Sequence, residues 1–396
     1  MSEMKNGVQF LVGNKNVSNT AIEPFNTEVC NFLDEFSKKL FLLKETKKFP
    51  DLITLAFWCR KSEISKLKSK FLSNENRLGL GLTFHITPSN IPTNFAYSLI
   101  FGLVTGNSNI IKVPSQEFEQ IEIICKCINN ILKKKYKRIK KMLTIVRYKN
   151  NDNFTKEISR NCNARLLWGG DKTISTIKSF PTNIKSLDLT FPDRYSFCVI
   201  DTNKLSKLSI KQIKELCVKF YNDTFLVDQN ACSSPHLILW LGKKNDKIKE
   251  LFWENLYEIV KKKYELNESA LFEKITNLYS SIISSSKIKK LKKYGNLIYI
   301  FELNEIEREN HKFRGKWGLF YELDIMNLDN IKNQINNKYQ TLSYYGVDKK
   351  ILKDFIFKNN LNGIDRVVPI GQTLDMSFFW DGYDINKLLT RVVDIK

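Results

Sequence analysis

The spacing of apolar side chains is helical over the first part of the chain. From residue 27 to residue 73, apolar positions recur three and four residues apart, as in "CNFLDEFSKKLFLL" and "LITLAFWCRKSEISKLKSKFL". This period places the apolar side chains on one face of a helix. The pattern therefore predicts amphipathic helices, and Asn26 or Thr27 is suited to cap the first of them.

The pattern changes at residue 79, where short apolar runs begin to alternate with helical stretches. The run "LGLGLTFHIT" predicts a strand that ends in the turn "PSNIP", and "IIKVPS" predicts a second buried strand after a helix over 93–109. The same alternation predicts further strands at 142–148, 164–170, 186–191 and 195–201, with helices at 117–141, at 153–161 and from residue 171. Alternating strands and helices indicate a parallel, doubly wound α/β sheet.

A second βα region is predicted beyond residue 201. Helices over 208–225 and 246–263 flank the segment "DQNACSSPHLILW", and "YGNLIYIFEL" predicts a later strand. The interval 265–290 is polar and weakly patterned, which indicates a helix and loop on the surface.

The C-terminal part, "NGIDRVVPIGQTLDMSFFWDGYDI", carries turn residues between short apolar runs and is expected to close the second domain. We therefore predict a first domain over 1–195, a second over 196–385 and a tail over 386–396.

Composition and charge narrow the class of protein. The 396 residues are 42% hydrophobic, which is a globular composition, and no apolar run reaches the roughly 18 residues of a membrane helix. With no basic-then-apolar leader at its start, the chain is expected to be cytoplasmic. The net charge of +21 and the run "KKKYKRIKK" at 133–141 suggest nucleic-acid binding. Lysine is abundant throughout and no recognition motif accompanies it, so we predict no nucleic-acid partner and an exposed helix end at this run.

The eight cysteines are scattered singly and lack the paired spacing of a zinc site. The close pair Cys125 and Cys127 lies in a helical pattern, where residues two apart point to different faces. We therefore expect no metal site and no disulfide. The question that remains is whether Cys232, which follows the polar turn "DQNA", does more than pack.

Three further segments give the chain a resemblance to a known family. "HITPSNIPTNFAYSLIFGLVTGNSNIIKVPS", "DQNACSSP" and "RVVPIGQTLDMSFFWDGYDI" together resemble the acyl-CoA reductase branch of the aldehyde dehydrogenase superfamily. That branch includes the reductase subunit of the bacterial bioluminescence fatty-acid reductase. The resemblance implies two doubly wound α/β domains, one for the cofactor and one for catalysis, with a cleft between them. It also implies reduction of an acyl thioester to an aldehyde.

The resemblance assigns the reacting residues. Cys232 matches the family's nucleophile, which takes the acyl group and so divides one difficult displacement into two easier steps. Asn90, in the turn "PSNIP", matches the asparagine whose side-chain amide donates to the oxyanion, and the backbone N–H of Cys232 would be the second donor. The flanking Pro88 and Pro92 restrict the backbone around Asn90.

The cofactor is expected to be NADPH, although no GxGxxG fingerprint is present. By resemblance, Lys112 contacts the adenosine ribose, and Ser115 replaces a glutamate that accepts the ribose hydroxyls in many NAD-using members. Losing that carboxylate relieves repulsion against a 2′-phosphate. Gly169 and Gly170 match the turn that lets the pyrophosphate approach a helix. Pro88 is also assigned to the cofactor side.

Asp188 is the residue at which the chain departs from aldehyde-oxidising relatives. It occupies the slot of their general-base glutamate, within "LDLTFP" and without the adjoining glycines, so a structural role is favoured. Reduction of a thioester needs no activated water, and the departure therefore fits a reductase. His85, His236 and His311 lack partners at ligand spacing and are expected to be structural or on the surface.

Two other functions remain open from the sequence. A second enzymatic interpretation is an NAD(P)-dependent aldehyde dehydrogenase that forms the acid, for which Asp188 would have to activate water. A non-catalytic basic binding protein on the same fold is the alternative from another class, and only the net charge supports it. For the reductase, the expected partners are an acyl-CoA or acyl-carrier thioester and an acyl-activating synthetase. A homo-oligomer is a further possibility.

Overall fold

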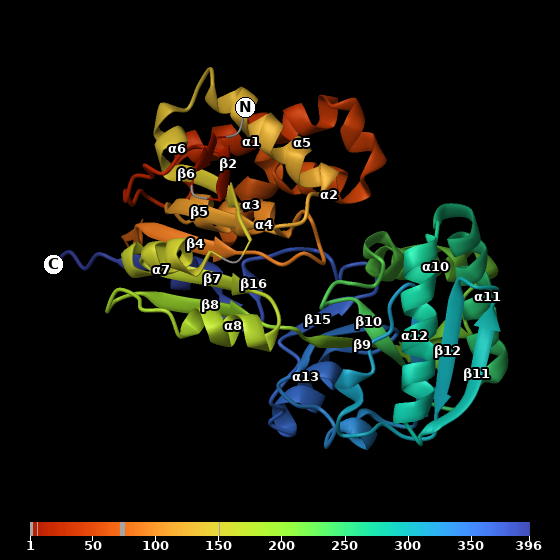
Figure 1. Cartoon of the computed structure of the whole chain (residues 1–396). Helices are drawn as coiled ribbons and strands as arrows, with labels where there is room; N and C mark the ends of the chain where they lie inside the picture. Colours follow the sequence, from red (N-terminus) through yellow and green to blue (C-terminus); the bar gives the residue numbers. More distant parts are fainter. Residues whose placement is uncertain (1–2, 6, 72–75, 150) are drawn as a thin grey trace. The chain divides into compact units, whose positions relative to one another are not determined.

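The computed structural model describes residues 3–5, 7–71, 76–149 and 151–396, which form two compact units. Unit 1 contains residues 1–192 and 378–396, and unit 2 contains residues 193–377 (Figure 1). The end of the chain thus belongs to unit 1, whereas the sequence pattern placed it in the second domain and a tail. The boundary also falls three residues before the predicted one.

Contacts of the C-terminal segment explain this difference. Strand β18 (Thr390–Val392) pairs antiparallel with β3 (Arg77–Gly79), and the Phe378 ring lies 5.0 Å from the Phe101 ring. The Arg77 side chain also donates to the hydroxyl of Thr390 at 2.7 Å. These long-range contacts leave no local sequence signal, so the periodicity could not predict them.

A sheet of seven strands forms the centre of unit 1, in the order β1-β2-β6-β5-β4-β7-β8. These strands are β1 (Glu3–Lys5), β2 (Val8–Val12), β4 (Leu82–Ile86), β5 (Ser108–Val113), β6 (Leu143–Arg147), β7 (Ala164–Trp168) and β8 (Leu187–Phe191). The neighbours from β6 to β8 are parallel, and β2 joins β6 antiparallel. Strands β4 to β7 are buried along their length except at Lys112, as expected for a parallel sheet covered on both faces.

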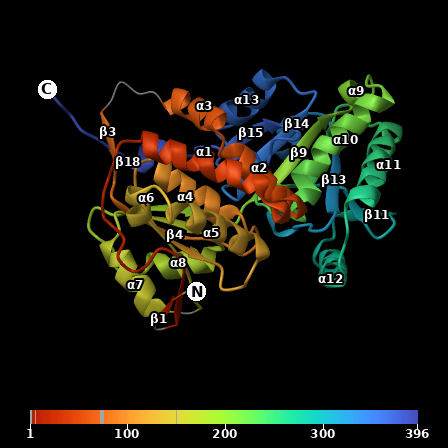
Figure 2. The same cartoon turned by 90° about the horizontal axis from the view of Figure 1, so that it is seen from above.

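The helices of unit 1 lie on both faces of this sheet (Figures 1 and 2). They are α1 (Thr27–Leu42), η1 (Lys44–Lys48), α2 (Pro50–Trp58), α3 (Lys61–Phe71), α4 (Asn94–Val104), α5 (Glu119–Leu132), α6 (Lys137–Met142), α7 (Asp152–Asn161), α8 (Asp171–Lys178) and α14 (Ile385–Leu388). Asn26 caps α1 by accepting the N–H of Glu28 at 3.0 Å. The helix predicted over 117–141 is interrupted, because Tyr136 adopts a left-handed conformation and its hydroxyl donates to Glu35.

Unit 2 contains a second sheet of seven strands, in the order β11-β12-β13-β10-β9-β14-β15. The strands are β9 (Tyr195–Asp201), β10 (Pro235–Leu241), β11 (Ile288–Tyr294), β12 (Ile298–Leu303), β13 (Leu319–Ile325), β14 (Tyr339–Tyr345) and β15 (Arg366–Pro369). Only the pairing of β11 with β12 is antiparallel among these strands. The two parallel-rich sheets confirm the predicted α/β class.

Two apolar layers cover the two faces of the second sheet. The helices are α9 (Thr202–Leu205), α10 (Ile210–Thr224), α11 (Asp246–Lys263), α12 (Glu268–Ser284) and α13 (Lys349–Lys358), with short turns η2 (Phe225–Val227), η3 (Asn310–Lys312) and η4 (Leu328–Ile331). One layer contains Phe220 and Trp253 from α10 and α11, and the other contains Leu278 from α12 with Phe301. Helices α10 and α11 lie side by side (Figures 1 and 2). Within the part of the chain described, no helix is both long and apolar enough to cross a membrane.

Candidate active site

Four predicted cofactor residues of unit 1 and the predicted oxyanion donor Asn90 lie at the carboxyl edge of its sheet. Asn90 and Pro88 follow β4, Lys112 lies near the end of β5, and Gly169 and Gly170 follow β7. Strands β5, β4 and β7 are neighbours and parallel, so these five positions share one edge. Ligands of open α/β sheets bind at this edge.

Lys112 lies partly buried at this edge. Its ammonium is 5.4 Å from the centre of the Tyr148 ring, and burial lowers the pKa of the lysine. Ser115 is exposed in the loop beyond β5. Two residues further on, the exposed Glu117 carboxylate lies 3.5 Å from the Arg147 guanidinium, which also pairs with Glu122 at 2.6 Å. Position 115 itself therefore carries no carboxylate, and the nearest one, Glu117, points toward Arg147.

The Gly169–Gly170 turn leads directly into α8. A methyl group added at Gly170 would have no heavy atom within 4 Å, so the space beside this backbone is open. The Gly169 N–H is already used, because it donates to the Phe191 carbonyl at 3.2 Å. The N-cap residue Gly170 makes no side-chain cap hydrogen bond at the start of α8, and the turn fits a dinucleotide pyrophosphate.

A buried polar network lies behind these turns. His85 on β4 places Nδ1 2.7 Å from the Ser98 hydroxyl and Nε2 3.0 Å from the Asn109 amide oxygen. The Trp168 indole N–H donates to the same Ser98 hydroxyl at 3.0 Å. Burial lowers the pKa of His85 to about 3, so the ring is neutral at physiological pH. His85 therefore joins the strands that carry the turns and has a structural role, as predicted.

Asp188 forms a bidentate ion pair with a buried arginine. Its two carboxylate oxygens accept from Arg165 Nε and Nη2, each at 2.6 Å, and Arg165 also donates to the carbonyl of Ile177 at 2.8 Å. Both oxygens of Asp188 are thus engaged, which supports the structural interpretation and disfavours its use as a base for water.

The loop that carries Cys232 is held by buried side chains of unit 2. Asp228 and Gln229 both have a positive φ, which is uncommon for residues with a side chain. The buried Gln229 amide donates to the carbonyls of Pro235 and Leu319 at 3.1 and 3.2 Å, and it accepts from the Gly318 N–H at 3.1 Å. These bonds fix the loop against β10 and β13.

Further bonds position Cys232 itself and the helix before it. The Ser196 hydroxyl donates to the Cys232 carbonyl at 2.6 Å. In α10, the buried Asp223 carboxylate accepts from the N–H groups of Gly371 and Thr373 at 2.6 and 3.0 Å, and burial raises its pKa to about 6. The segment "RVVPIGQT" is thereby tied to the helix that leads into the Cys232 loop.

The Cys232 thiol lies beside an ion pair. It donates to Asp193 Oδ1 at 3.6 Å, and the same oxygen accepts from Arg314 Nη1 at 2.5 Å. Cys232 is partly exposed, whereas six other cysteines are buried and Cys30 is partly exposed. Burial raises the pKa of each of the seven other thiols. An arginine close to an accessible thiol is the setting of a reactive cysteine, and Arg314 lies one carboxylate oxygen away from the Cys232 thiol.

Asp193, Arg314 and Gln229 were not identified from the sequence. Gln229 stands within the quoted motif and could have been flagged by its position three residues before Cys232. Asp193 and Arg314 lie 39 and 82 residues from Cys232 along the chain, in segments without a motif. That Asn90 and Cys232 act on the same carbonyl stays a prediction.

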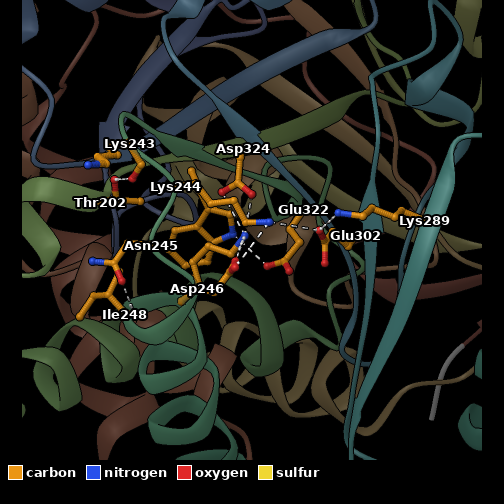
Figure 3. Close-up of polar contacts among 12 residues, drawn as sticks. Thr202, Lys243, Lys244, Asn245, Asp246, Ile248, Lys289, Glu302, Glu322 and Asp324 are labelled. Carbon is orange, nitrogen blue, oxygen red and sulfur yellow. Dashed lines mark hydrogen bonds and ion pairs between the residues drawn. The ribbon is translucent and has the colours of Figure 1, made fainter.

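A second charged cluster in unit 2 is internally neutralised. Near the carboxyl ends of β12 and β13, Lys289 pairs with Glu302 at 2.9 Å (Figure 3). Lys249 pairs with Asp324 at 2.8 Å. The fully buried Glu322 accepts from Lys292 and from two indole N–H groups, each at 2.9 Å. Because these charges are paired, we assign the cluster to stability. No group of three metal-ligating side chains occurs within residues 3–5, 7–71, 76–149 and 151–396.

Comparison with solved structures identifies the fold. The chain superposes on lactaldehyde dehydrogenase from Escherichia coli with a TM-score of 0.63 at 13% identity, covering 92% of this chain and 86% of that one. It superposes on indole-3-acetaldehyde dehydrogenase complexed with NAD⁺ with a TM-score of 0.66 at 12% identity, covering 92% and 83%. The fold is therefore that of the aldehyde dehydrogenases.

Sequence comparison then defines the family. The profile of the acyl-CoA reductase (LuxC) family matches residues 60–391, and the chain belongs to that family. It is 25% identical over 301 residues to the long-chain acyl-protein thioester reductase of Vibrio harveyi, covering 74% of this chain and 58% of that protein. The protein of the same name from Photorhabdus luminescens is 25% identical over 210 residues, covering 52% and 37%. The chain thus spans less than two thirds of the length of either of these two relatives.

Proposed function

We propose that this protein reduces a long-chain acyl thioester, carried by coenzyme A or by an acyl-carrying protein, to the aldehyde through an S-acyl intermediate on Cys232. The observation that carries the proposal is the position of the Cys232 thiol beside the Asp193–Arg314 ion pair. Membership of the acyl-CoA reductase family and the names of the two bacterial relatives support the substrate class.

Asp193 and Arg314 would activate the thiol. The Asp193 carboxylate accepts the hydrogen bond of the thiol, whose proton leaves to solvent, and the Arg314 charge stabilises the thiolate that forms. The thiolate then attacks the thioester carbonyl, and the oxyanion accepts from the Asn90 amide and the Cys232 N–H. When the carbonyl re-forms, the carrier leaves as a thiolate that takes a proton from solvent, and the acyl group stays on Cys232.

The second half-reaction needs a hydride. A bound NADPH would supply it to the S-acyl cysteine. The resulting thiohemiacetal collapses to the free aldehyde and the Cys232 thiolate. Lys112 would meet the 2′-phosphate, Ser115 would leave room for it, and the N-terminus of α8 after Gly169 and Gly170 would hold the pyrophosphate. One solved relative by fold, from Methanocaldococcus jannaschii, is complexed with NADP.

Single-turnover trapping tests the chemistry. Incubation with a fatty acyl-CoA and no NADPH should attach the acyl group to the tryptic peptide that contains "DQNACSSPH", and NADPH should then release it as aldehyde. Cys232→Ser should stop both steps and leave NADPH affinity within about twofold, because the side chain is not part of the adenosine site. Cys30→Ser is the matched control, since Cys30 is the other partly exposed cysteine. Acyl label on another cysteine, or full reduction by Cys232→Ser, would refute the proposal.

The role of the ion pair has its own test. Arg314→Gln should lower the rate of acylation by at least about tenfold while the later hydride step keeps its rate, because the guanidinium acts on the free thiolate. Lys312→Gln, two residues away and paired with Glu309, is the matched control. Equal acylation rates in wild type and Arg314→Gln would remove the activation step from the mechanism.

An acyl-activating synthetase as the source of the thioester remains part of this proposal.

A further inference from the structure

Helix α12 carries its apolar side chains on the outside. Five large apolar residues of the helix are between 38% and 85% exposed. They are Phe272, Ile275, Tyr279, Ile282 and Ile283. The buried side of the same helix contains Ala270, Lys274, Leu278 and Ser281. This distribution is the reverse of an ordinary surface helix, whose apolar stripe faces the core.

Polar contacts hold the inner face of α12 on its sheet. The Lys274 ammonium donates to the carbonyls of Asn296 and Leu297 at 2.8 and 2.9 Å. The hydroxyls of Ser281 and Tyr321 lie 2.6 Å apart. These bonds, together with Leu278, attach the helix without the five exposed residues. The exposed stripe is therefore free to bind something outside unit 2.

The spacing of the stripe is that of a helix-pairing seam. Phe272, Ile275, Tyr279 and Ile282 follow one another at intervals of three, four and three residues, which are the a and d positions of two heptads. Ile283 extends the stripe next to the last of them. Because α12 has 17 residues, the seam runs along a helix of roughly 25 Å. Such a seam fits another helix rather than an irregular surface.

We propose that α12 pairs antiparallel with α12 of a second copy of this chain. In an antiparallel pair, a positions face d positions, so Phe272 would meet Ile282 of the other copy and Ile275 would meet Tyr279. Each layer then combines one aromatic side chain with one isoleucine. A two-fold axis repeats both layers, so the stripe is complementary to itself, as an interface between identical chains requires.

The charges at the ends of the helix favour the same arrangement. Glu268 begins α12, and Lys287, which already pairs with Glu305, lies just beyond its end. Antiparallel pairing brings Glu268 of one copy to the end that carries Lys287 of the other. A bilayer is the less suitable partner, because a membrane-surface helix carries lysine or arginine beside its apolar stripe. On α12 the flanking exposed charges are Glu268 and Glu273, and its lysine is buried.

Sedimentation equilibrium between about 1 and 200 µM tests the pairing with the full chain. One helical seam is smaller than the roughly 800 Å² per partner of a standard interface, so a dimer dissociating in the micromolar range is expected. Tyr279→Glu and Ile282→Glu should each weaken dimerisation at least tenfold. Phe357→Glu is the matched control, because Phe357 is a similarly exposed aromatic residue on α13. Circular dichroism should show all three variants to be folded.

Disulfide trapping tests the direction of the helices. In a Cys232→Ser background, the double variant Phe272→Cys with Ile282→Cys should form a covalent dimer under mild oxidation, because the two positions face each other across the seam. Phe272→Cys alone should not, since its two copies would lie roughly 15 Å apart along the antiparallel pair. Cross-linking by Phe272→Cys alone would overturn the antiparallel arrangement.

Two results would overturn the whole inference. One is a monomer throughout the concentration range. The other is flotation with vesicles of phosphatidylglycerol and phosphatidylcholine that Tyr279→Glu abolishes, which would assign the stripe to a membrane surface. Neither depends on reductase activity, so this inference and the proposed function can fail separately.

Discussion

Iodoacetamide at pH 8 should modify Cys232 at least about a hundredfold faster than any of the six buried cysteines. The reagent reacts with the thiolate, so the rate depends on the thiolate fraction and on access. Burial raises the pKa of Cys162 to about 11 and that of Cys127 to about 12. At pH 8 these thiols are only about 10⁻³ and 10⁻⁴ ionised, whereas an ordinary cysteine with a pKa of about 8.5 is roughly one quarter ionised.

This comparison gives ratios of thiolate fraction of about 250 for Cys162 and about 2,500 for Cys127 before access is considered. Cys30 should react at an intermediate rate, because it is partly exposed but burial raises its pKa. Timed alkylation, acid quenching and mass spectrometry of tryptic peptides would give each rate in one experiment. In guanidinium chloride the eight rates should converge, which shows that the folded structure causes the difference.

Arg314→Gln should slow the alkylation of Cys232 without changing the rate at Cys30. The guanidinium would stabilise the Cys232 thiolate, whereas the Cys30 thiol donates to the Phe25 carbonyl at 3.4 Å. If a buried cysteine reacted within tenfold of Cys232, or if Cys30 reacted first, the assignment of Cys232 as the nucleophile would lose its physical basis.

Three further predictions concern the cofactor site and its supports. We expect the wild type to prefer NADPH over NADH by about tenfold or more, and Ser115→Glu should reduce this preference to near equality. The reason is that the new carboxylate would stand where Lys112 would meet the 2′-phosphate. Steady-state kinetics with both cofactors measure the preference, and an unchanged ratio would contradict the assignment of this loop to the cofactor. The folded pKa of His85 is about 3 and its unfolded pKa about 6.5, so the unfolded state binds the extra proton and stability falls as the pH drops below 6.5. By pH 5 this loss is about 2 kcal/mol, and His85→Gln should show a flatter dependence of the unfolding free energy in urea titrations between pH 7 and 5. Asp188→Asn should lower the unfolding free energy by about 3 kcal/mol or more, because it leaves the buried Arg165 without its carboxylate; a variant of unchanged stability with lost reductase activity would instead give Asp188 a chemical role.

The local periodicity of the chain was enough to predict most helices and strands of the βα regions. Helix α11 begins and ends at the predicted residues, and the strands on either side of the Asn90 turn lie where the apolar runs placed them. These elements follow from the sequence because apolar spacing is a property of neighbouring residues. The motif around Cys232 was also local, and with the resemblance it directed attention to one thiol among eight.

The surroundings of that thiol were determined only by the tertiary structure. Asp193 and Arg314 come from segments far apart in the sequence, and strand order alone brings them to Cys232. The same holds for the network of His85, Ser98 and Trp168, and for β18, which returns to unit 1 from the end of the chain. Pairing of this kind depends on which strands become neighbours, and no short window of sequence encodes it.

Helix α12 shows what apolar periodicity cannot predict. Its apolar spacing, Phe272, Ile275, Tyr279 and Ile282, has a helical period, but the period does not say which face of the helix meets the core. The bonds of Lys274 to two backbone carbonyls turn the polar face inward and leave the apolar face outside. A buried lysine whose ammonium is hydrogen-bonded can thus take the place of an apolar side chain on the inner face of a helix. Lys274 can do so only because the folded chain places the carbonyls of Asn296 and Leu297 within its reach.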